Sequence, residues 1–115
     1  MNYDPIFDKW HEECGVFGVF DRTVDVARYV YWGLFALQHR GQESAGIAIT
    51  DGNEVALKKG MGLLTEAIKE LPTLKSHMGT GHVRYSTTGS NNPRNIQPLV
   101  IHYQGGQIAV AHNGN

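Results

Sequence analysis

Cys14 is the only cysteine of the 115-residue chain, and it raises the question of thiol chemistry. A lone cysteine at the start of an apolar run is most often a small buried side chain. Attack on a substrate requires the thiolate, so a thiol with the ordinary pKa of about 8.5 needs a base. If residues 1–13 were removed, the freed α-amino group of Cys14, with a pKa of about 8, could accept the thiol proton. The residues alone leave both interpretations of Cys14 open.

Arg84 and the pair Asn113-Gly114 are the other groups with a chemical interpretation. Arg84 stands in GHVRYSTTG, at the end of a predicted strand. It is either an ordinary surface charge or a fork that binds a substrate carboxylate through two parallel hydrogen bonds. Asn113-Gly114 is either a simple turn or an oxyanion hole, in which the Asn amide and a backbone N–H stabilise a tetrahedral intermediate.

The six histidines of the chain do not form a metal-binding pattern. Their spacing contains no HExxH, no H-x3-H and no Cys/His zinc arrangement, so we expect no metal site here. The glycine-rich runs around Gly60 and Gly79 lack the P-loop pattern, so we do not expect nucleotide binding either. The histidines are His11, His39, His77, His82, His102 and His112.

The composition is that of a soluble globular protein. The chain has 10 Lys+Arg against 11 Asp+Glu, a formal net charge of −1, 41% hydrophobic residues and 18% charged residues. This near-neutral balance, without a basic block, argues against nucleic acid or an anionic membrane as a partner. No apolar stretch approaches the roughly 18 residues that span a bilayer, and the N-terminus has no secretory signal pattern. Because a single cysteine permits no internal disulfide, we expect a cytoplasmic protein.

Alternating apolar runs and turn signals predict an α+β domain with five or six strands and two helices. Helical spacing of apolar residues between 25 and 40 predicts one helix, with Thr23 or Asp25 as its N-terminal cap and Gly41 as its C-terminal cap. A short second helix is predicted over residues 65–71, stopped by Pro72. The predicted strands are CGVFGVF at 14–20, AGIAIT at 45–50, EVALK at 54–58, GHVRYST at 81–87, LVIHY at 99–103 and QIAVAH at 107–112.

Four sequence blocks together resemble the N-terminal glutaminase domain of the glutamine phosphoribosylpyrophosphate amidotransferases. They occur in that family's order and cover the chain from Cys14 to its end. Within the wider group, the second and third blocks resemble the phosphoribosyl branch rather than the hexosamine-forming or asparagine synthetase branches. The blocks are CGVFG at 14–18, LQHRGQESAG at 37–46, GHVRYST at 81–87 and AHNGN at 111–115.

The resemblance implies how the nucleophile is made. In this family the nucleophile becomes the N-terminal residue, and Cys14 occupies that place. Residues 1–13 resemble the propeptide of those members that carry one, which ends in acidic residues as Glu12-Glu13 does here. We therefore expect residues 1–13 to be a leader that is removed.

The resemblance also implies the substrate contacts. Arg84, with Thr87 nearby, would hold the α-carboxylate of glutamine, and Asn113 with Gly114 would form the oxyanion hole. The block at 39–41 would have a supporting role. The acidic residue that binds the glutamine amino group would lie beyond residue 115.

The implied activity is glutamine amide transfer in purine biosynthesis. Cys14 would hydrolyse glutamine to glutamate and ammonia, and the full enzyme would use that ammonia to displace pyrophosphate from phosphoribosylpyrophosphate, giving 5-phosphoribosylamine. The full enzyme would be a homo-oligomer that uses Mg²⁺ and, as in members with a propeptide, a 4Fe–4S cluster. The ligands of both would lie outside this chain, whose only cysteine is Cys14.

The fold implied is the four-layer αββα sandwich of the N-terminal-nucleophile hydrolases. We expect residues 14–115 to be the N-terminal part of a truncated type-2 glutamine amidotransferase domain. Such a piece would leave sheet edges and apolar faces uncovered, and we expect it to be inactive by itself.

Two alternatives stay open at this point. The same glutaminase chemistry could serve another acceptor, such as a sugar phosphate, and the deciding phosphoribosylpyrophosphate-binding loop would follow residue 115. The chain could also be a degenerate, non-catalytic binding module. The joint presence of Cys14, Arg84, Asn113 and Gly114 weighs against this last interpretation.

Overall fold

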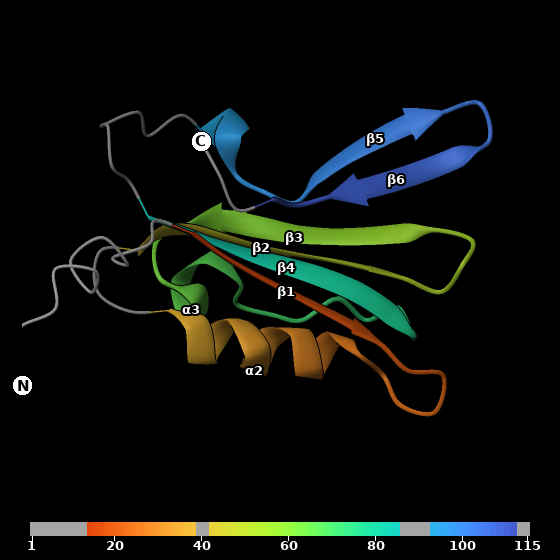
Figure 1. Cartoon of the computed structure of the whole chain (residues 1–115), viewed down its shortest axis with the longest axis horizontal. Helices are drawn as coiled ribbons and strands as arrows, with labels where there is room; N and C mark the ends of the chain where they lie inside the picture. Colours follow the sequence, from red (N-terminus) through yellow and green to blue (C-terminus); the bar gives the residue numbers. More distant parts are fainter. Residues whose placement is uncertain (1–13, 39–41, 86–92, 113–115) are drawn as a thin grey trace, which may run out of the picture.

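The computed structural model describes residues 14–38, 42–85 and 93–112, which form two β-sheets and a helical layer (Figure 1). One sheet has four strands and the other has two. The elements in chain order are β1 (Cys14–Phe20), α2 (Ala27–Leu37), β2 (Gln42–Thr50), β3 (Val55–Met61), α3 (Leu64–Ala67), β4 (Met78–Tyr85), the 3₁₀ turn η1 (Pro93–Asn95), β5 (Leu99–Tyr103) and β6 (Gly106–Val110).

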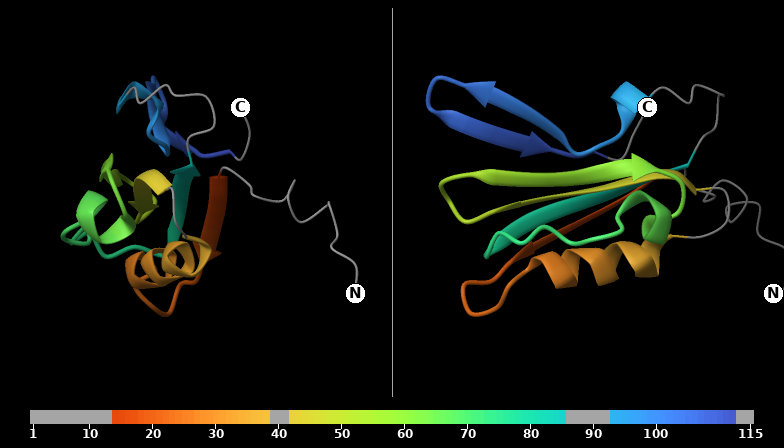
Figure 2. Two further views of the ribbon diagram at one scale, coloured as in Figure 1. Left: turned by 90° about the vertical axis from the view of Figure 1, so that its left-hand side faces the viewer. Right: turned by 180° about the vertical axis from the view of Figure 1, so that it is seen from behind.

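The elements stack in layers, with the four-stranded sheet in the middle (Figure 2). Helices α2 and α3 cover one face of this sheet, and the hairpin of β5 and β6 lies over the other (Figures 1 and 2). The strand order is β1-β4-β2-β3, and every neighbouring pair is antiparallel. The α+β class predicted from the sequence is therefore confirmed, and the helix–sheet–sheet order matches three layers of an αββα sandwich.

The hydrophobic core fills the space between the helices and the four-stranded sheet. Val30 and Leu34 of α2 are fully buried, and they pack with Ile47, Ile49 and Val83 of the sheet. Close packing of α2 on β4 depends on Gly81, because a Cβ atom there would lie 2.6 Å from the Leu34 Cδ1 atom. Burial of these side chains supplies the main stabilisation of the domain.

The hairpin of β5 and β6 is held to the sheet at its near end by the segment before β5. A Cβ atom at Gly46 of β2 would overlap the carbonyl oxygen of Gln97, so this glycine lets the segment cross the sheet. The Lys59 Nζ atom donates to the carbonyl oxygen of Ile96 at 3.0 Å. Farther along, the Gln107 side chain accepts a hydrogen bond of 3.1 Å from the backbone N–H of Val55. The contacts of Gln97 and Lys59 fix the end of the hairpin from which the chain continues to residue 112, whereas that of Gln107 lies near the turn.

The six predicted strands and the two predicted hairpins are confirmed, but several strand ends are corrected. Strand β2 begins at Gln42 and not at residue 45, β3 continues to Met61, β4 begins at Met78, and β6 ends at Val110.

The predicted short second helix is corrected as well. Its predicted span was 65–71, whereas α3 covers only Leu64–Ala67. Ile68 already has extended backbone angles, and its side chain is 4% exposed in the core. Burial of this side chain ends the helix before Pro72 can stop it.

The predicted caps of α2 also need correction. The helix begins after Val26, which makes no side-chain cap, and Thr23 instead hydrogen-bonds to Asp21. At the start of the helix Asp25 accepts a long hydrogen bond of 3.4 Å from the N–H of Ala27. The helix ends at Leu37 with Gln38 in an extended conformation, so its end precedes Gly41, which lies outside the described residues.

Both outer layers carry exposed apolar side chains, as expected for a part of a larger sandwich. On α2 these are Tyr29, Trp32 and Phe35, and on the hairpin they include Ile101 and Ile108, each at least 43% exposed. A hydrophobic patch of this kind is typical of a surface that another layer or partner covers.

Candidate functional site

Strand pairing brings Cys14 and Arg84 together, although they lie far apart in the sequence. Their Cα atoms are partners in the antiparallel register of β1 and β4, and Arg84 is also paired with Ser44 of β2. Directly opposite residues of neighbouring strands project to the same face of a sheet. Cys14, Arg84 and Ser44 therefore form a row across three strands at one end of the sheet.

This row faces the hairpin layer and not the helices. Side chains alternate along a strand, so His82 shares the face of Arg84, and His82 is paired with Gly46. Gly46 is the residue against which the Gln97 backbone packs. The candidate site thus lies between the two sheets, where the β1 and β4 ends meet the segment that follows β6.

Cys14 is the first residue of β1 and is 9% exposed. It follows residues 1–13, which lie outside the described part of the chain. Its burial fits the interpretation as a small core residue as well as that of a nucleophile in an enclosed site, so the placement beside Arg84 is the more informative observation.

The Arg84 guanidinium forms an ion pair with Glu43, with 3.5 Å between Arg84 Nε and Glu43 Oε2. The side chains are 23% and 15% exposed, so the pair is partly shielded from solvent. Glu43 lies in a β-bulge, because Gln42 pairs with Tyr85 and Ser44 with Arg84, which leaves Glu43 as the extra residue. Bulges re-aim side chains and are common beside active sites.

The Glu43 contact was not predicted from the sequence. Glu43 belongs to a block that carried the resemblance, but a bulge is set by strand pairing and has no local sequence signal here. The ion pair lies at the Nε edge of the guanidinium, where the 3.5 Å contact does not have hydrogen-bond geometry.

His82 is the second site residue that sequence reasoning missed. Its side chain is 1% exposed, and its Nε2 atom lies 3.1 Å from the carbonyl oxygen of His112. A carbonyl only accepts, so Nε2 carries the proton and donates. Burial lowers the pKa of His82 to about 4, although the hydrogen bond to His112 opposes this effect; the nearby Arg84 and His112 lower it further. The His82 ring is therefore uncharged near pH 7 and donates a hydrogen bond from Nε2.

The backbone of His112 is bound on its other side by Gln97. The N–H of His112 donates to Gln97 Oε1 at 2.7 Å, and the Gln97 side chain is 6% exposed. His112 directly precedes Asn113 in the chain. The predicted site residues Thr87, Asn113 and Gly114, and the block at 39–41, lie outside the described residues.

Three loop contacts fix the sheet end that carries Cys14 and Arg84. Tyr85 donates from its hydroxyl to the carbonyl oxygen of Leu37 at 3.1 Å, which joins the end of β4 to the end of α2. The Gln42 amide donates to the carbonyl oxygen of Gly62, and Gln38 accepts from the N–H of Leu64. Gln38 and Gln42, on either side of the block at 39–41, are thus anchored to the start of α3 and to the turn before it.

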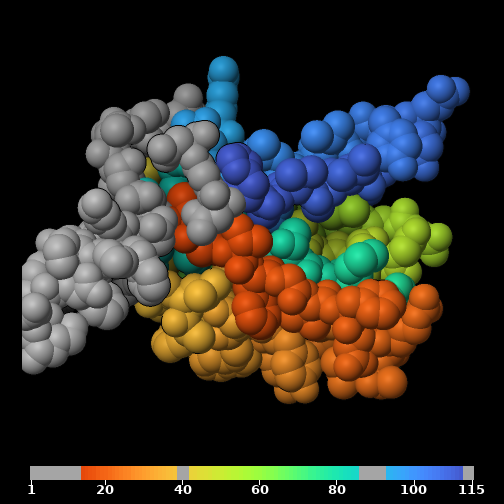
Figure 3. Space-filling view, viewed as in Figure 1, coloured from red at the N-terminus to blue at the C-terminus, as the bar shows by residue number. Residues whose placement is uncertain are grey.

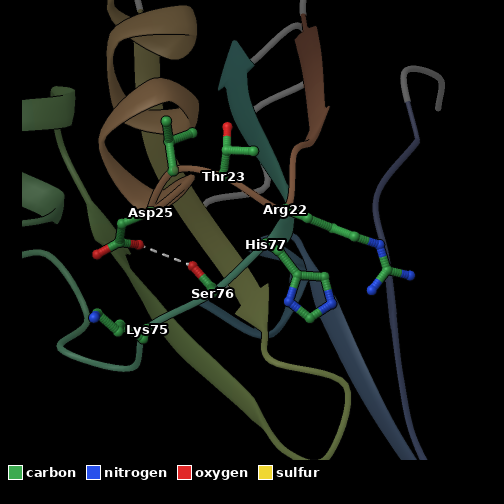
Figure 4. A pocket seen from close by; sticks show the side chains of 7 residues that line it. Arg22, Thr23, Asp25, Lys75, Ser76 and His77 are labelled. Atoms are coloured by element: carbon green, nitrogen blue, oxygen red, sulfur yellow. Dashed lines mark hydrogen bonds between the residues drawn. The ribbon is translucent and has the colours of Figure 1, made fainter.

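A polar pocket of about 250 Å³ lies at the opposite end of β1 (Figure 4). It contains Asp25, Ser76 and His77, but the Ser76 hydroxyl donates to Asp25 at 3.1 Å. Among the described residues no hydrogen bond joins Ser76 to the His77 ring, so these side chains do not form a catalytic triad. The pocket lies between the segment that precedes α2 and the segment that precedes β4.

A larger apolar groove of about 730 Å³ lies between the hairpin and the four-stranded sheet, toward the turn of the hairpin (Figure 3). Phe20, Met78 and Ile108 are among its lining residues. Within residues 14–38, 42–85 and 93–112, no three His, Cys, Asp or Glu side chains are grouped to hold a metal ion. No helix in the described part of the chain is long and apolar enough to cross a membrane.

The packed sheets, with Cys14 and Arg84 paired on an inner face, agree with the family that the sequence comparison identifies. The chain belongs to the class-II glutamine amidotransferases, whose family model matches residues 32–115. The fold is that of the N-terminal-nucleophile amidotransferases, as two solved structures show.

Similarity to individual proteins narrows the assignment within this family. The chain is 47% identical over 108 residues to the amidophosphoribosyltransferase of Methanothermobacter thermautotrophicus. This alignment covers 90% of the present chain and 23% of that protein. It resembles "Structure of the allosteric regulatory enzyme of purine biosynthesis" with a TM-score of 0.73 and 43% identity, over 82% of this chain and 21% of that one.

A further solved structure is the glutamine phosphoribosylpyrophosphate amidotransferase from B. subtilis complexed with ADP and GMP. It matches with a TM-score of 0.72 and 41% identity, over 84% of this chain and 21% of that one. The resemblance to the phosphoribosylpyrophosphate amidotransferases is therefore confirmed. The chain spans less than a quarter of the length of these relatives.

Proposed function

We propose that this chain is the N-terminal part of the glutaminase domain of an amidophosphoribosyltransferase, with Cys14 as its nucleophile. The observation that carries this proposal is the pairing of Cys14 with Arg84 on the inner face of the sheet. A glutamine whose α-carboxylate binds the Arg84 fork would extend its side-chain amide along the same face. The names of the relatives support phosphoribosylpyrophosphate over a sugar phosphate as the acceptor.

The reaction begins at the thiol. The α-amino group of a processed Cys14 accepts the thiol proton, and the thiolate attacks the side-chain amide carbon of glutamine. Asn113 and Gly114 stabilise the resulting oxyanion. The C–N bond then breaks, the ammonium group returns its proton to the leaving nitrogen, and ammonia departs from a γ-glutamyl thioester. Water attacks the thioester carbon, releasing glutamate and restoring the thiol.

The second half of the reaction belongs to the rest of the full-length protein. There, ammonia displaces pyrophosphate from phosphoribosylpyrophosphate to give 5-phosphoribosylamine. The Mg²⁺ and the 4Fe–4S cluster that the resemblance implies would be held by other parts of the full-length protein. A cluster needs cysteine thiolates beyond Cys14, the single cysteine of this sequence. Among the described residues, no three His, Cys, Asp or Glu side chains are grouped to hold a metal ion.

Residues 1–13 fit the role of a propeptide in this proposal. While Glu13 is attached to Cys14, the nitrogen of Cys14 is an amide and has no basic lone pair. Removal of the leader would create the base and the nucleophile on one residue. The proposed enzyme would work in the cytoplasm as a homo-oligomer.

The proposal is tested in the full-length protein by comparing two nitrogen sources. Cys14→Ser should abolish synthesis of phosphoribosylamine from glutamine, because a hydroxyl is a far weaker nucleophile than a thiolate at neutral pH. Synthesis from added ammonia should persist. Equal activity of the variant with glutamine, or no activity of the unaltered protein with phosphoribosylpyrophosphate from either source, would refute the proposal.

A further inference from the structure

Two buried side chains hold the backbone of His112 from opposite sides. His82 donates from Nε2 to the His112 carbonyl oxygen at 3.1 Å, and Gln97 accepts from the His112 N–H at 2.7 Å. His82 is on β4 of the four-stranded sheet, whereas Gln97 precedes β5 of the other layer. Both backbone groups of one residue are thus satisfied by side chains from two different layers.

Burial of a polar side chain costs free energy unless its polar atoms form hydrogen bonds. His82 is 1% exposed, and its Nδ1 atom has no hydrogen-bond partner among the described residues. Burial also lowers the pKa of the ring to about 4. An apolar side chain at this position would avoid the unsatisfied ring nitrogen. The hydrogen bond to His112 is the one contact of the ring that an apolar residue could not replace.

The geometry of the peptide bond explains why His112 matters. The six atoms from one Cα to the next lie nearly in a plane, so the direction of the His112 carbonyl also sets the plane through which the chain enters Asn113. Gln97 sets the preceding peptide plane in the same way. Together the two hydrogen bonds fix the orientation of the backbone N–H and carbonyl groups of His112, the residue that precedes Asn113.

We propose that His82 and Gln97 are positioning residues of the glutaminase site, which hold the His112 backbone so that Asn113-Gly114 is placed for the oxyanion. This inference rests on the proposed function. His82 lies two residues before Arg84 on the same strand and face, so one strand both binds the substrate carboxylate and sets the oxyanion-binding segment. Neither side chain contacts the reacting atoms in this role.

The test uses full-length protein and separates kcat from KM for glutamine. His82→Ala should lower glutaminase kcat at least about tenfold, a part of the 10²–10³ that loss of an oxyanion-hole donor costs. KM for glutamine should change less than about twofold, because the oxyanion exists only in the transition state. Synthesis from added ammonia should be retained. His82→Gln, which keeps an N–H donor at similar reach, should recover most of kcat.

Val83→Ala is the matched control for lost stability. Val83 is the next residue of β4, is fully buried, and faces the helix layer, so it cannot contact His112. It should lower the melting temperature while leaving kcat of the folded protein unchanged. If His82→Ala has the same kcat per folded molecule as Val83→Ala, or if His82→Gln is as impaired as His82→Ala, the positioning role is wrong.

Hydrogen exchange tests the Gln97 contact without any assay of activity. Gln97→Leu should speed exchange of the His112 amide at least about tenfold, because its acceptor is lost. Gln107→Leu is the control, since Gln107 also accepts from a backbone N–H, that of Val55, elsewhere on the hairpin. Unchanged exchange in Gln97→Leu would overturn the inference alone, whereas an unaltered protein that cannot hydrolyse glutamine would overturn the proposed function beneath it.

Discussion

Cys14 and Arg84 are paired residues of adjacent antiparallel strands, and the guanidinium of Arg84 forms an ion pair with Glu43 at 3.5 Å. The Cys14 thiol and the Arg84 guanidinium, which we propose binds the carboxylate of glutamine, therefore share one face of the sheet. This arrangement suits a substrate with a carboxylate at one end and a reactive amide at the other, and the following predictions test its parts.

Replacing Arg84 by Lys in the full-length protein should weaken glutamine binding. Lysine keeps the charge but loses the planar fork that makes two parallel hydrogen bonds. We expect a raised KM for glutamine and unchanged activity with ammonia, measured by steady-state kinetics with each nitrogen source. Equal loss of both activities would show that Arg84 supports the fold instead.

Glu43→Gln should have a smaller effect on the same parameter. An ion pair with this exposure contributes at most about 1 kcal/mol, so loss of its charge should raise KM for glutamine by no more than about fivefold. The control is Glu54→Gln, an exposed residue at the far turn of the β2–β3 hairpin, which should leave KM unchanged. A KM unaffected by Glu43→Gln would mean that Arg84 is oriented without it.

Asn113→Ala should act on the transition state. The glutaminase kcat should fall by about 10²–10³, the range for removal of one oxyanion-hole donor, while synthesis from added ammonia continues. An unchanged kcat would return Asn113 to the role of a turn residue.

Removal of residues 1–13 should be required for reaction at Cys14. Intact-mass analysis of the full-length protein should show mature chains that begin at Cys14. An electrophilic glutamine analogue should label these chains much faster than chains that keep the leader, because only a free α-amine can accept the thiol proton. If both forms are labelled at one rate and both hydrolyse glutamine, the amine is not the base.

Acid should destabilise the protein through His82. Its pKa is about 4 in the folded state against an ordinary value of 6.5, so the unfolded chain binds the proton more tightly. Full stability is present above pH 6.5 and is lost as the pH falls toward 4, by up to about 3 kcal/mol at roughly 1.4 kcal/mol per pKa unit.

The measurement is the difference in melting temperature between the unaltered protein and His82→Gln as a function of pH. This difference should shift in favour of the variant between pH 6.5 and 4. Asp21 and Asp51 also have lowered pKa values, through hydrogen bonds from Thr23 and from the backbone of Glu54, but they titrate below 3.8 and outside this window. A difference that does not vary with pH would mean that His82 is not buried as a neutral ring.

Much of this protein could be predicted from local sequence. Apolar alternation and turn residues determine all six strands and the helix α2, because these signals act between near neighbours. The short helix α3 was predicted too long, since burial of the Ile68 side chain overrode local preference. The four blocks CGVFG, LQHRGQESAG, GHVRYST and AHNGN together were sufficient to predict the family.

The arrangement of the candidate site could not be predicted from local sequence and became clear only from the tertiary structure. Strand order β1-β4-β2-β3 places Cys14 beside Arg84, and no local signal specifies which strands become neighbours. The bulge that turns Glu43 toward Arg84 arises only when β2 pairs with β4, and the hydrogen bonds of His82 and Gln97 to His112 arise only when the two sheets pack. Sequence determined the elements and the chemical types, whereas long-range pairing and layer packing determined which side chains meet, because those contacts join residues that are distant along the chain.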